Sequence, residues 1–192
     1  MGYAVHLYFD SELEAAFLKV RTALTTAGVT PTLERLGDRP HVSLVVMHDA
    51  NPGKCIALLQ DFAHQRPRMP TAFGAFGSFP TAQGVVYLSP DPTDALFDAH
   101  RQICERLEVT GSQVHEYYLP DNWVPHATIG FELPRAEVQL ALGWLQTNFR
   151  PLRGEFASIG LVEFPPVTEL ASFSLQALTA ASTPTPSFPR FS

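Results

Sequence analysis

The chain has 192 residues, of which 45% are hydrophobic and 17% charged, and its formal net charge at pH 7 is −6. This composition is typical of a globular protein, and no apolar run reaches the ~18 to 20 residues that a membrane span requires. An acidic chain whose basic residues are scattered is a poor match for long duplex RNA or DNA, because nonspecific affinity for a duplex depends on neutralising its phosphates.

Hydrophobic patterning predicts alternating strands and helices along the chain, with Ser11 and Glu14 as the capping box of the first helix. The expected elements, in chain order, are a strand over 3–9, a helix over 11–27, a loop over 29–40, a strand over 41–47, a helix over 52–64, a hairpin over 71–89, a helix from Asp91-Pro92, a polar and aromatic loop over 110–125, a strand over 126–131, a helix from Pro134, and strands over 154–163 and 170–178.

This order predicts one α+β domain over residues 1–178, in which each half carries similar elements. Residues 179–192 are rich in Ser, Thr and Pro, and we expect them to be disordered. Cys55 and Cys104 are too few and too isolated for a disulfide framework, and they are expected to be buried thiols. Since the N-terminal residues also lack the pattern of a secretory signal, we expect a cytoplasmic protein, monomeric and without membrane contact.

Two stretches 85 residues apart share one pattern: Pro-His-Val-Ser-Leu over 40–44 and Pro-His-Ala-Thr-Ile over 125–129. Because a strand places residues i and i+2 on one face, each copy presents an imidazole and a hydroxyl together and buries the residues between them. One such histidine alone is more often structural. The repetition favours a functional site in which the two strands lie side by side and the histidines meet at the seam between the halves.

Two imidazoles that face one phosphorus atom can divide proton transfer between them. One of His41 and His126, neutral, takes a proton from the attacking water, and the other, protonated, gives a proton to the leaving oxygen. The hydroxyls of Ser43 and Thr128 are placed to donate hydrogen bonds to the phosphate oxygens. The two copies are chemically equivalent, so the sequence does not distinguish the acid from the base.

Other chemistry fits these residues less well. A zinc site would need a second strong ligand near each histidine, and neither motif offers one, so no metal and no cofactor is expected. A serine nucleophile would normally lie on a Gly-x-Ser-x-Gly turn, which is absent from the sequence.

Three further residues are candidates for lining the substrate site. Arg39 directly precedes the first motif, and Tyr118 and Trp123 lie in the loop before the second. An aromatic face in that loop could stack a nucleobase. Trp123 could equally pack beneath the loop as core. His6, His48 and His115 could approach the site, but their spacing does not require it.

The paired His-x-Ser/Thr motifs, the Trp123-Val124-Pro125 approach to the second motif and the segment 73–88 resemble the 2H phosphoesterase superfamily, especially its bacterial 2′,3′-cyclic phosphodiesterase and 2′-5′ RNA ligase-like (LigT-like) branch. The resemblance covers residues 3–178. It implies a bilobal fold, two antiparallel sheets lining a central cleft with helices outside, and metal-independent opening of a 2′,3′-cyclic phosphate to a 2′-phosphate. It also implies that His41 and His126 are the acid/base pair and that Ser43 and Thr128 bind the phosphate.

The expected partner is a nucleotide or an RNA end that carries a cyclic phosphate. Relatives of this type that act on RNA ends often have extra basic residues in the cleft, whereas here only Arg39 adjoins a motif, which counts against tight RNA binding. Three alternatives stay open at this stage: 2′-5′ ligation of RNA ends, a nucleotide-binding module without turnover, and an unrelated α+β domain whose motifs are coincidental.

Overall fold

The structure is a computed structural model and describes residues 2–177. The strands are β1 (Gly2–Phe9), β2 (His41–Asp49), β3 (Met69–Ser78), β4 (Val86–Pro90), β5 (Gln113–Val114), β6 (Ala127–Gly130), β7 (Leu152–Phe164) and β8 (Thr168–Ser174). The helices are α1 (Ser11–Thr26), α2 (Thr32–Leu36), α3 (Pro52–Gln65), α4 (Asp94–Glu108) and α5 (Arg135–Asn148), with a 3₁₀ turn η1 (Glu116–Tyr118). The α+β class is confirmed.

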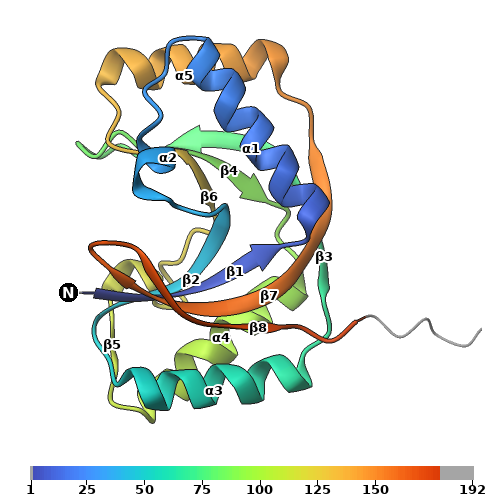
Figure 1. The fold of residues 1–192 in the computed structure, drawn as a ribbon, viewed down its shortest axis with the longest axis vertical. Coiled ribbons are helices and arrows are strands. Elements are labelled where there is room, and N and C mark those ends of the chain that lie inside the picture. The colour runs from blue at the N-terminus through green and yellow to red at the C-terminus, as the bar shows by residue number, and fades with distance from the viewer. Residues whose placement is uncertain (1, 178–192) are drawn as a thin grey trace, which may run out of the picture.

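The strands form one antiparallel sheet in the order β5-β2-β1-β7-β3-β4-β6, and β8 pairs with β7. The resemblance implied two antiparallel sheets, and the long strand β7 joins them into one. Its first residues, Leu152 to Phe156, pair with β3, and its remaining residues, from Phe156 to Phe164, pair with β1. Strand β7 therefore joins β1, β2 and β5 to β3, β4 and β6 in one continuous, strongly curved sheet (Figure 1).

The order of strands shows the duplication that the sequence suggested. The series β1, α1, β2, α3, β3 is followed along the chain by a second series of the same kind, β4, α4, β6, α5, β7. The path β2-β1-β7-β3-β4-β6 reads the same from both ends when each strand is replaced by its counterpart. The histidine strands β2 and β6 are counterparts near opposite ends of this path. They are not hydrogen-bonded neighbours, as a side-by-side arrangement would require, and face each other because the sheet curves.

The helices cover the sheet in two pairs (Figure 1). Helices α3 and α4 pack at one end of the molecule, where α3 contacts β7 and β8 and α4 contacts β2. Helices α1 and α5 pack at the other end, where α1 contacts β6 and β7 and α5 contacts β3 and β4. Helix α1, which belongs to the first half of the chain, thus packs against the strand that carries the second motif.

Four phenylalanines pack together where β7 passes from β3 to β1. Phe9 of β1 and Phe17 of α1 stack with ring centroids 4.7 Å apart, and Phe17 and Phe73 of β3 meet edge to face at 4.9 Å. Phe156 of β7 completes the cluster, and all four side chains are buried. Aromatic rings bury a large apolar area in fixed geometries, so this cluster holds the two sides of the sheet in one arrangement.

The start of helix α1 differs from the expected capping box. Asp10, not Ser11, is the N-cap, and its carboxylate accepts hydrogen bonds from the backbone N–H groups of Glu12 and Leu13 at 3.0 and 2.8 Å. A carboxylate at this position satisfies two free N–H groups and interacts favourably with the positive end of the helix dipole. The boundary moves by one residue, and the helix itself is as predicted.

Two loops contain more structure than expected. The segment 29–40 includes the short helix α2, and the segment 110–125 includes β5 and η1. The expected disorder of 179–192 lies outside the described residues. Within residues 2–177, the structure contains no helix that is long and apolar enough to cross a membrane.

Candidate active site

The first motif lies at the start of β2. His41 and Ser43 are partly buried on one face of the strand, whereas Val42 and Leu44 are fully buried in the core. This is the two-residue alternation that the sequence predicts for a strand. The core therefore fixes the direction of the imidazole and the hydroxyl through the residues between them.

The second motif repeats the arrangement with one difference. Strand β6 begins at Ala127, so His126 lies just before the strand, and Thr128 is two residues further on. Ala127 and Ile129 are buried, which leaves His126 and Thr128 on the opposite face. Each motif thus supplies one histidine and one hydroxyl in the predicted geometry.

Both histidines make the same backbone contact. The Nδ1 atom of His41 is 2.7 Å from the carbonyl oxygen of Arg39, and that of His126 is 2.7 Å from the carbonyl oxygen of Val124. A carbonyl oxygen only accepts hydrogen bonds, so each Nδ1 carries a hydrogen and donates it. In the neutral ring the proton acceptor is then Nε2, which is the atom free for proton transfer.

His41 is surrounded by polar and ionisable groups. The ring of His6 stacks on it, with centroids 3.6 Å apart and an angle of 8° between the planes, and the Asp38 carboxylate lies 3.5 Å from its Nδ1. Burial, together with the adjacent His41, keeps the pKa of His6 well below its ordinary value. His6 is therefore a neutral ring against the first histidine.

His126 is surrounded by aromatic rings instead. Phe79 meets its ring edge to face at 4.8 Å and Tyr87 at 5.5 Å. Burial lowers the pKa of His126, the hydrogen bond to Val124 opposes this effect, and the charge of His41 adds to it. The two motif histidines are thus close enough to influence each other electrostatically.

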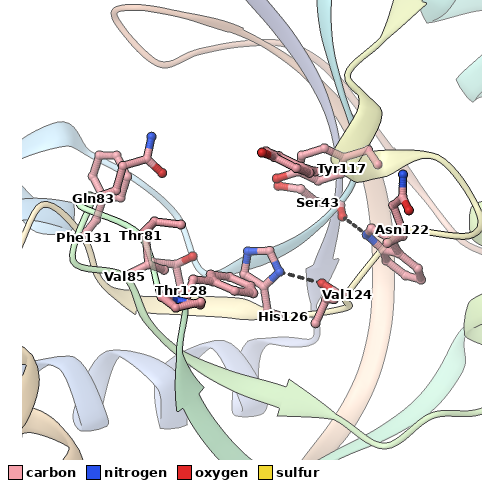
Figure 2. A pocket seen from close by; sticks show the side chains of 14 residues that line it. Ser43, Thr81, Gln83, Val85, Tyr117, Asn122, Val124, His126, Thr128 and Phe131 are labelled. Carbon is pink, nitrogen blue, oxygen red and sulfur yellow. Dashed lines mark hydrogen bonds between the residues drawn. The ribbon is translucent and has the colours of Figure 1, made fainter.

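A cavity of about 480 Å³ opens beside the second motif (Figure 2). In Figure 2, His126 lies between two groups of side chains, with Thr81, Gln83 and Phe131 on one side and Ser43, Tyr117 and Asn122 on the other. Among the described residues, His41 is not part of the lining. The lining residues are Ser43, Phe79, Pro80, Thr81, Gln83, Val85, Tyr117, Tyr118, Asn122, Trp123, Val124, His126, Thr128 and Phe131.

The three further candidates from the sequence have different positions. Tyr118 and Trp123 line the cavity, and Trp123 is also buried, with its Nε1–H donating to the carbonyl oxygen of Ser43 at 3.0 Å. Arg39 lies outside the lining. Its guanidinium donates to Glu14 Oε2 at 2.9 and 2.7 Å and covers the Tyr8 ring at 4.4 Å, so its charge is already paired.

Trp123 is both a core residue and a lining residue, the two interpretations that the sequence left open. Its indole stacks on the buried ring of His100, with centroids 4.0 Å apart, as a core residue would. One edge still faces the cavity, and its hydrogen bond to Ser43 ties the loop of the second motif to the strand of the first.

Sequence reasoning did not identify several residues near the histidines. The most important are Asp38, Phe79 and Tyr87, and Gln83 and Asn122 of the cavity lining. Tyr87 is the counterpart of His6 in the second half, because it pairs with Thr128 in the sheet just as His6 pairs with Ser43. Over the described part of the chain, no cluster of three or more His, Cys, Asp or Glu side chains is placed to hold a metal ion.

These features define an α+β protein in which two His-x-Ser/Thr strands meet at one cavity. The profile of the 2′-5′ RNA ligase superfamily matches residues 9–165. The chain belongs to this superfamily, and the resemblance to 2H phosphoesterases is confirmed.

Individual relatives are more distant. A protein of Geobacillus thermodenitrificans (strain NG80-2) named "Putative phosphoesterase" is 30% identical over 101 residues, which are 51% of this chain and 54% of the relative. The match therefore spans about half the length of that curated relative.

Two solved structures share the fold. TT0787 of Thermus thermophilus has a TM-score of 0.62 and 17% identity, over 93% of this chain and 100% of that chain. LigT of E. coli, complexed with 3′-AMP, has a TM-score of 0.61 and 15% identity, over 90% of this chain and 97% of that chain. At this level of identity they support the fold.

Proposed function

We propose that this protein is a metal-independent phosphodiesterase that opens the 2′,3′-cyclic phosphate of a nucleotide or RNA end and leaves a 2′-phosphate. The observation that carries the proposal is the matched pair of imidazoles, each donating Nδ1–H to a carbonyl oxygen at 2.7 Å. Each ring is thereby left with Nε2 for proton transfer, and each has a hydroxyl two residues further along.

The surroundings favour different roles for the two histidines. His126, whose pKa burial lowers, is neutral near pH 7 and suits the general base. The Asp38 carboxylate, 3.5 Å from His41 Nδ1, is placed to stabilise an imidazolium at His41, which suits the general acid.

The reaction then proceeds in one displacement at phosphorus. Nε2 of His126 takes a proton from water as the water oxygen bonds to phosphorus. The bond from phosphorus to O3′ breaks, and O3′ receives the proton from Nε2 of His41. Ser43 and Thr128 donate hydrogen bonds to the nonbridging oxygens, where negative charge increases. The product is a 2′-phosphate, with His126 protonated and His41 neutral until protons exchange with water.

The cavity supports a small substrate. Its described lining has hydroxyl, amide and aromatic groups and contains no Lys, Arg, Asp or Glu side chain. A nucleobase can stack on an exposed aromatic ring such as Tyr117, and amides such as Asn122 can hydrogen-bond to its edge. The E. coli LigT structure contains 3′-AMP, which is consistent with nucleotide binding on this fold.

The superfamily description also favours a related ring opening, in which the 5′-hydroxyl of an RNA replaces water as the nucleophile and a 2′-5′ bond forms. The same acid and base would serve both reactions, because the 5′-hydroxyl gives its proton to the base and O3′ takes its proton from the acid, as in hydrolysis. The uncharged lining argues that hydrolysis of small substrates is the main activity.

One panel tests the proposal. The protein is incubated, with chelator present, with the four nucleoside 2′,3′-cyclic phosphates and with an oligoribonucleotide that ends in a cyclic phosphate, and the position of the product phosphate is determined by ³¹P NMR. A parallel reaction supplies a 5′-hydroxyl RNA and is assayed for a 2′-5′ bond. We expect 2′-phosphate products.

The control for this panel is His64→Ala, which removes an exposed histidine at the end of α3, outside the cavity lining. It should retain the parent rate, whereas His41→Ala and His126→Ala should not. Binding of cyclic nucleotides without turnover would instead identify a nucleotide-binding module.

A further inference from the structure

Arg21 is a buried charge between the two motifs. It lies on α1, and its side chain is 2% exposed. Its Nη1 donates to the carbonyl oxygen of Asp38 at 2.7 Å, and its Nη2 donates to the carbonyl oxygen of Thr128 at 2.8 Å. Asp38 is three residues before His41, and Thr128 is two residues after His126. A single guanidinium therefore contacts the backbone of both motifs.

This connection matters because the sheet does not join the two motifs directly. Strands β2 and β6 lie near opposite ends of the hydrogen-bonded path, so their separation depends on contacts across the seam. Arg21 makes one contact across the seam, and the hydrogen bond from Trp123 to the carbonyl oxygen of Ser43 is another. The fork geometry of a guanidinium is suited to holding two acceptors at a fixed spacing.

Asp38 extends the connection to the ring of His41. One carboxylate oxygen, Oδ2, lies 3.4 Å from Arg21 Nη2, and the other, Oδ1, lies 3.5 Å from His41 Nδ1. The carboxylate therefore divides its interaction between the Arg21 guanidinium and the His41 imidazole. Its effect on His41 depends on Arg21, which both orients it and offsets its charge.

Packing alone does not require a charge here. Moving a guanidinium out of water is costly, and apolar residues of similar volume often replace buried ion pairs without loss of stability. Arg21 is thus better explained by what it positions.

We propose that Arg21 is a positioning residue that sets the separation of the two histidine motifs and holds the Asp38 carboxylate against His41. Its effect on turnover rests on the proposed phosphodiesterase function, whereas its effect on His41 does not.

Other titratable and charged groups lie near His41 and Arg21 and contribute to the titration of His41. Those that face His41 are His6 and Tyr8 of β1, Asp38 of the preceding loop and His126 of the second motif, with Arg39 over the Tyr8 ring. The acidic groups near Arg21 are Asp38, Glu34 and Glu14.

Arg21→Met, which retains most of the side-chain volume, tests positioning. We expect kcat to fall about 10²-fold, the scale for a misplacement of about 1 Å between reacting groups, and KM to change much less. Arg21→Lys keeps the charge without the fork and should lie between the parent and Arg21→Met. A KM effect with unchanged kcat would overturn the proposal.

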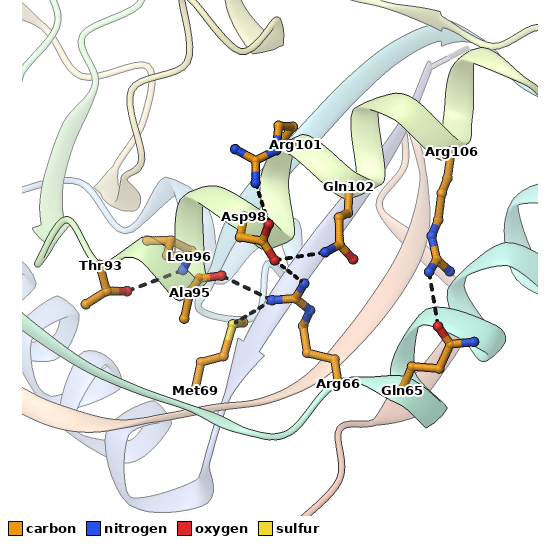
Figure 3. A network of polar contacts seen from close by, with 10 residues as sticks. All are labelled: Gln65, Arg66, Met69, Thr93, Ala95, Leu96, Asp98, Arg101, Gln102 and Arg106. Atoms are coloured by element: carbon orange, nitrogen blue, oxygen red, sulfur yellow. Dashed lines mark hydrogen bonds and ion pairs between the residues drawn. The ribbon is translucent and has the colours of Figure 1, made fainter.

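Arg66→Met is the matched control (Figure 3). Arg66 likewise binds a carboxylate and a carbonyl oxygen, that of Asp98 at 2.8 Å and that of Ala95 at 3.3 Å, and none of its network lines the cavity. Its loss should lower the melting temperature and leave kcat unchanged. An equal loss of kcat in both variants would make Arg21 merely structural.

A second readout needs no substrate. The titration of each imidazole is followed by NMR in protein with ¹³C-labelled histidine, and the signals are assigned with His41→Ala and His126→Ala. Arg21→Lys keeps the charge but holds the Asp38 carboxylate less firmly, and Asp38→Asn removes the carboxylate, so the midpoint of His41 should fall in both variants, by roughly 0.5 to 1 pH unit in Asp38→Asn and by less in Arg21→Lys. A midpoint that rises or does not move in Arg21→Lys would overturn the proposal.

The two readouts separate the two proposals. If the parent protein has no activity on any substrate while the His41 midpoint falls in both Arg21→Lys and Asp38→Asn, the proposed function fails and the positioning role stands. If the parent is active and the midpoints do not move, the reverse holds. Should Arg21→Met not fold, Arg21→Lys and Asp38→Asn give the same comparison.

Discussion

The two halves of the molecule present their histidines with the same backbone geometry in different surroundings. Each histidine donates Nδ1–H to the carbonyl oxygen two residues before it and has a hydroxyl two residues after it. Around His41 the neighbours are a histidine and a carboxylate, whereas around His126 they are two aromatic rings. The two copies share their backbone geometry, and the neighbours give each copy a different electrostatic environment.

The helices that support the motifs show the same divergence. Arg21 of α1 and Cys104 of α4 each lie eleven residues after the N-cap of their helix, and each contacts a carbonyl oxygen of the segment that leads to a motif. Arg21 brings a charge to this position. Cys104 brings a neutral thiol, because burial raises its pKa to about 11. The segment that leads to the first motif is therefore contacted by a charged group, and the segment that leads to the second by a neutral one.

Removal of either histidine should have the largest effect. His41→Ala and His126→Ala should each lower kcat about 10²- to 10⁴-fold, because each takes away one partner in proton transfer. The double variant should lose less than the product of the two, since the pair acts as a unit. The measurement is kcat and KM on the best substrate of the panel. Full activity in either variant would contradict the acid/base pair.

Phe79→Ala tests the aromatic side of the comparison. Because burial lowers the pKa of His126, removing a ring that covers it should raise that pKa toward the ordinary value of about 6.5. A base must be deprotonated to act, so the low-pH limb of the kcat/KM profile should move to higher pH.

The control for this substitution is Phe76→Ala, which removes a ring of β3 that packs on Phe149. It should leave the limb in place. Movement of the high-pH limb in Phe79→Ala would instead assign the acid role to His126.

His6→Phe tests the polar side and should have the smallest effect. His6 is neutral in the folded protein because its pKa is held well below the ordinary value, whereas an unfolded histidine takes up a proton below about pH 6.5. Its contribution to stability is therefore complete above that pH and is lost as the pH falls.

Urea unfolding at pH values from about 7.5 to 5 measures this contribution. In His6→Phe the slope of the unfolding free energy against pH should decrease by an amount that corresponds to at most one bound proton. The phenyl ring that replaces the imidazole can still stack on His41. A variant with the slope of the parent would show that His6 takes up its proton without unfolding.

Most of the fold could be predicted because its signals are local. The two-residue alternation of Val42 and Leu44 between His41 and Ser43 predicts a strand and its buried face, and the structure confirms it. The errors in the predicted elements lie where the local signal is ambiguous. Asp10 and Ser11 are both suitable N-cap residues for α1, and α2 is too short to show a hydrophobic period. The joining of two sheets into one could not be read from the sequence, because strand pairing is a long-range choice.

By itself, the sequence determined the two histidines, their hydroxyls and the duplicated fold, since a strand's side-chain period and a repeated motif need no knowledge of distant contacts. Only the tertiary structure decided what surrounds each histidine. Asp38, His6 and Arg21 reach His41 and its motif from a loop, a neighbouring strand and a helix, and Phe79 reaches His126 from a hairpin. Burial and charge act through space over a few ångströms, so the proposed division of the pair into a base and an acid depends on packing that no local pattern specifies.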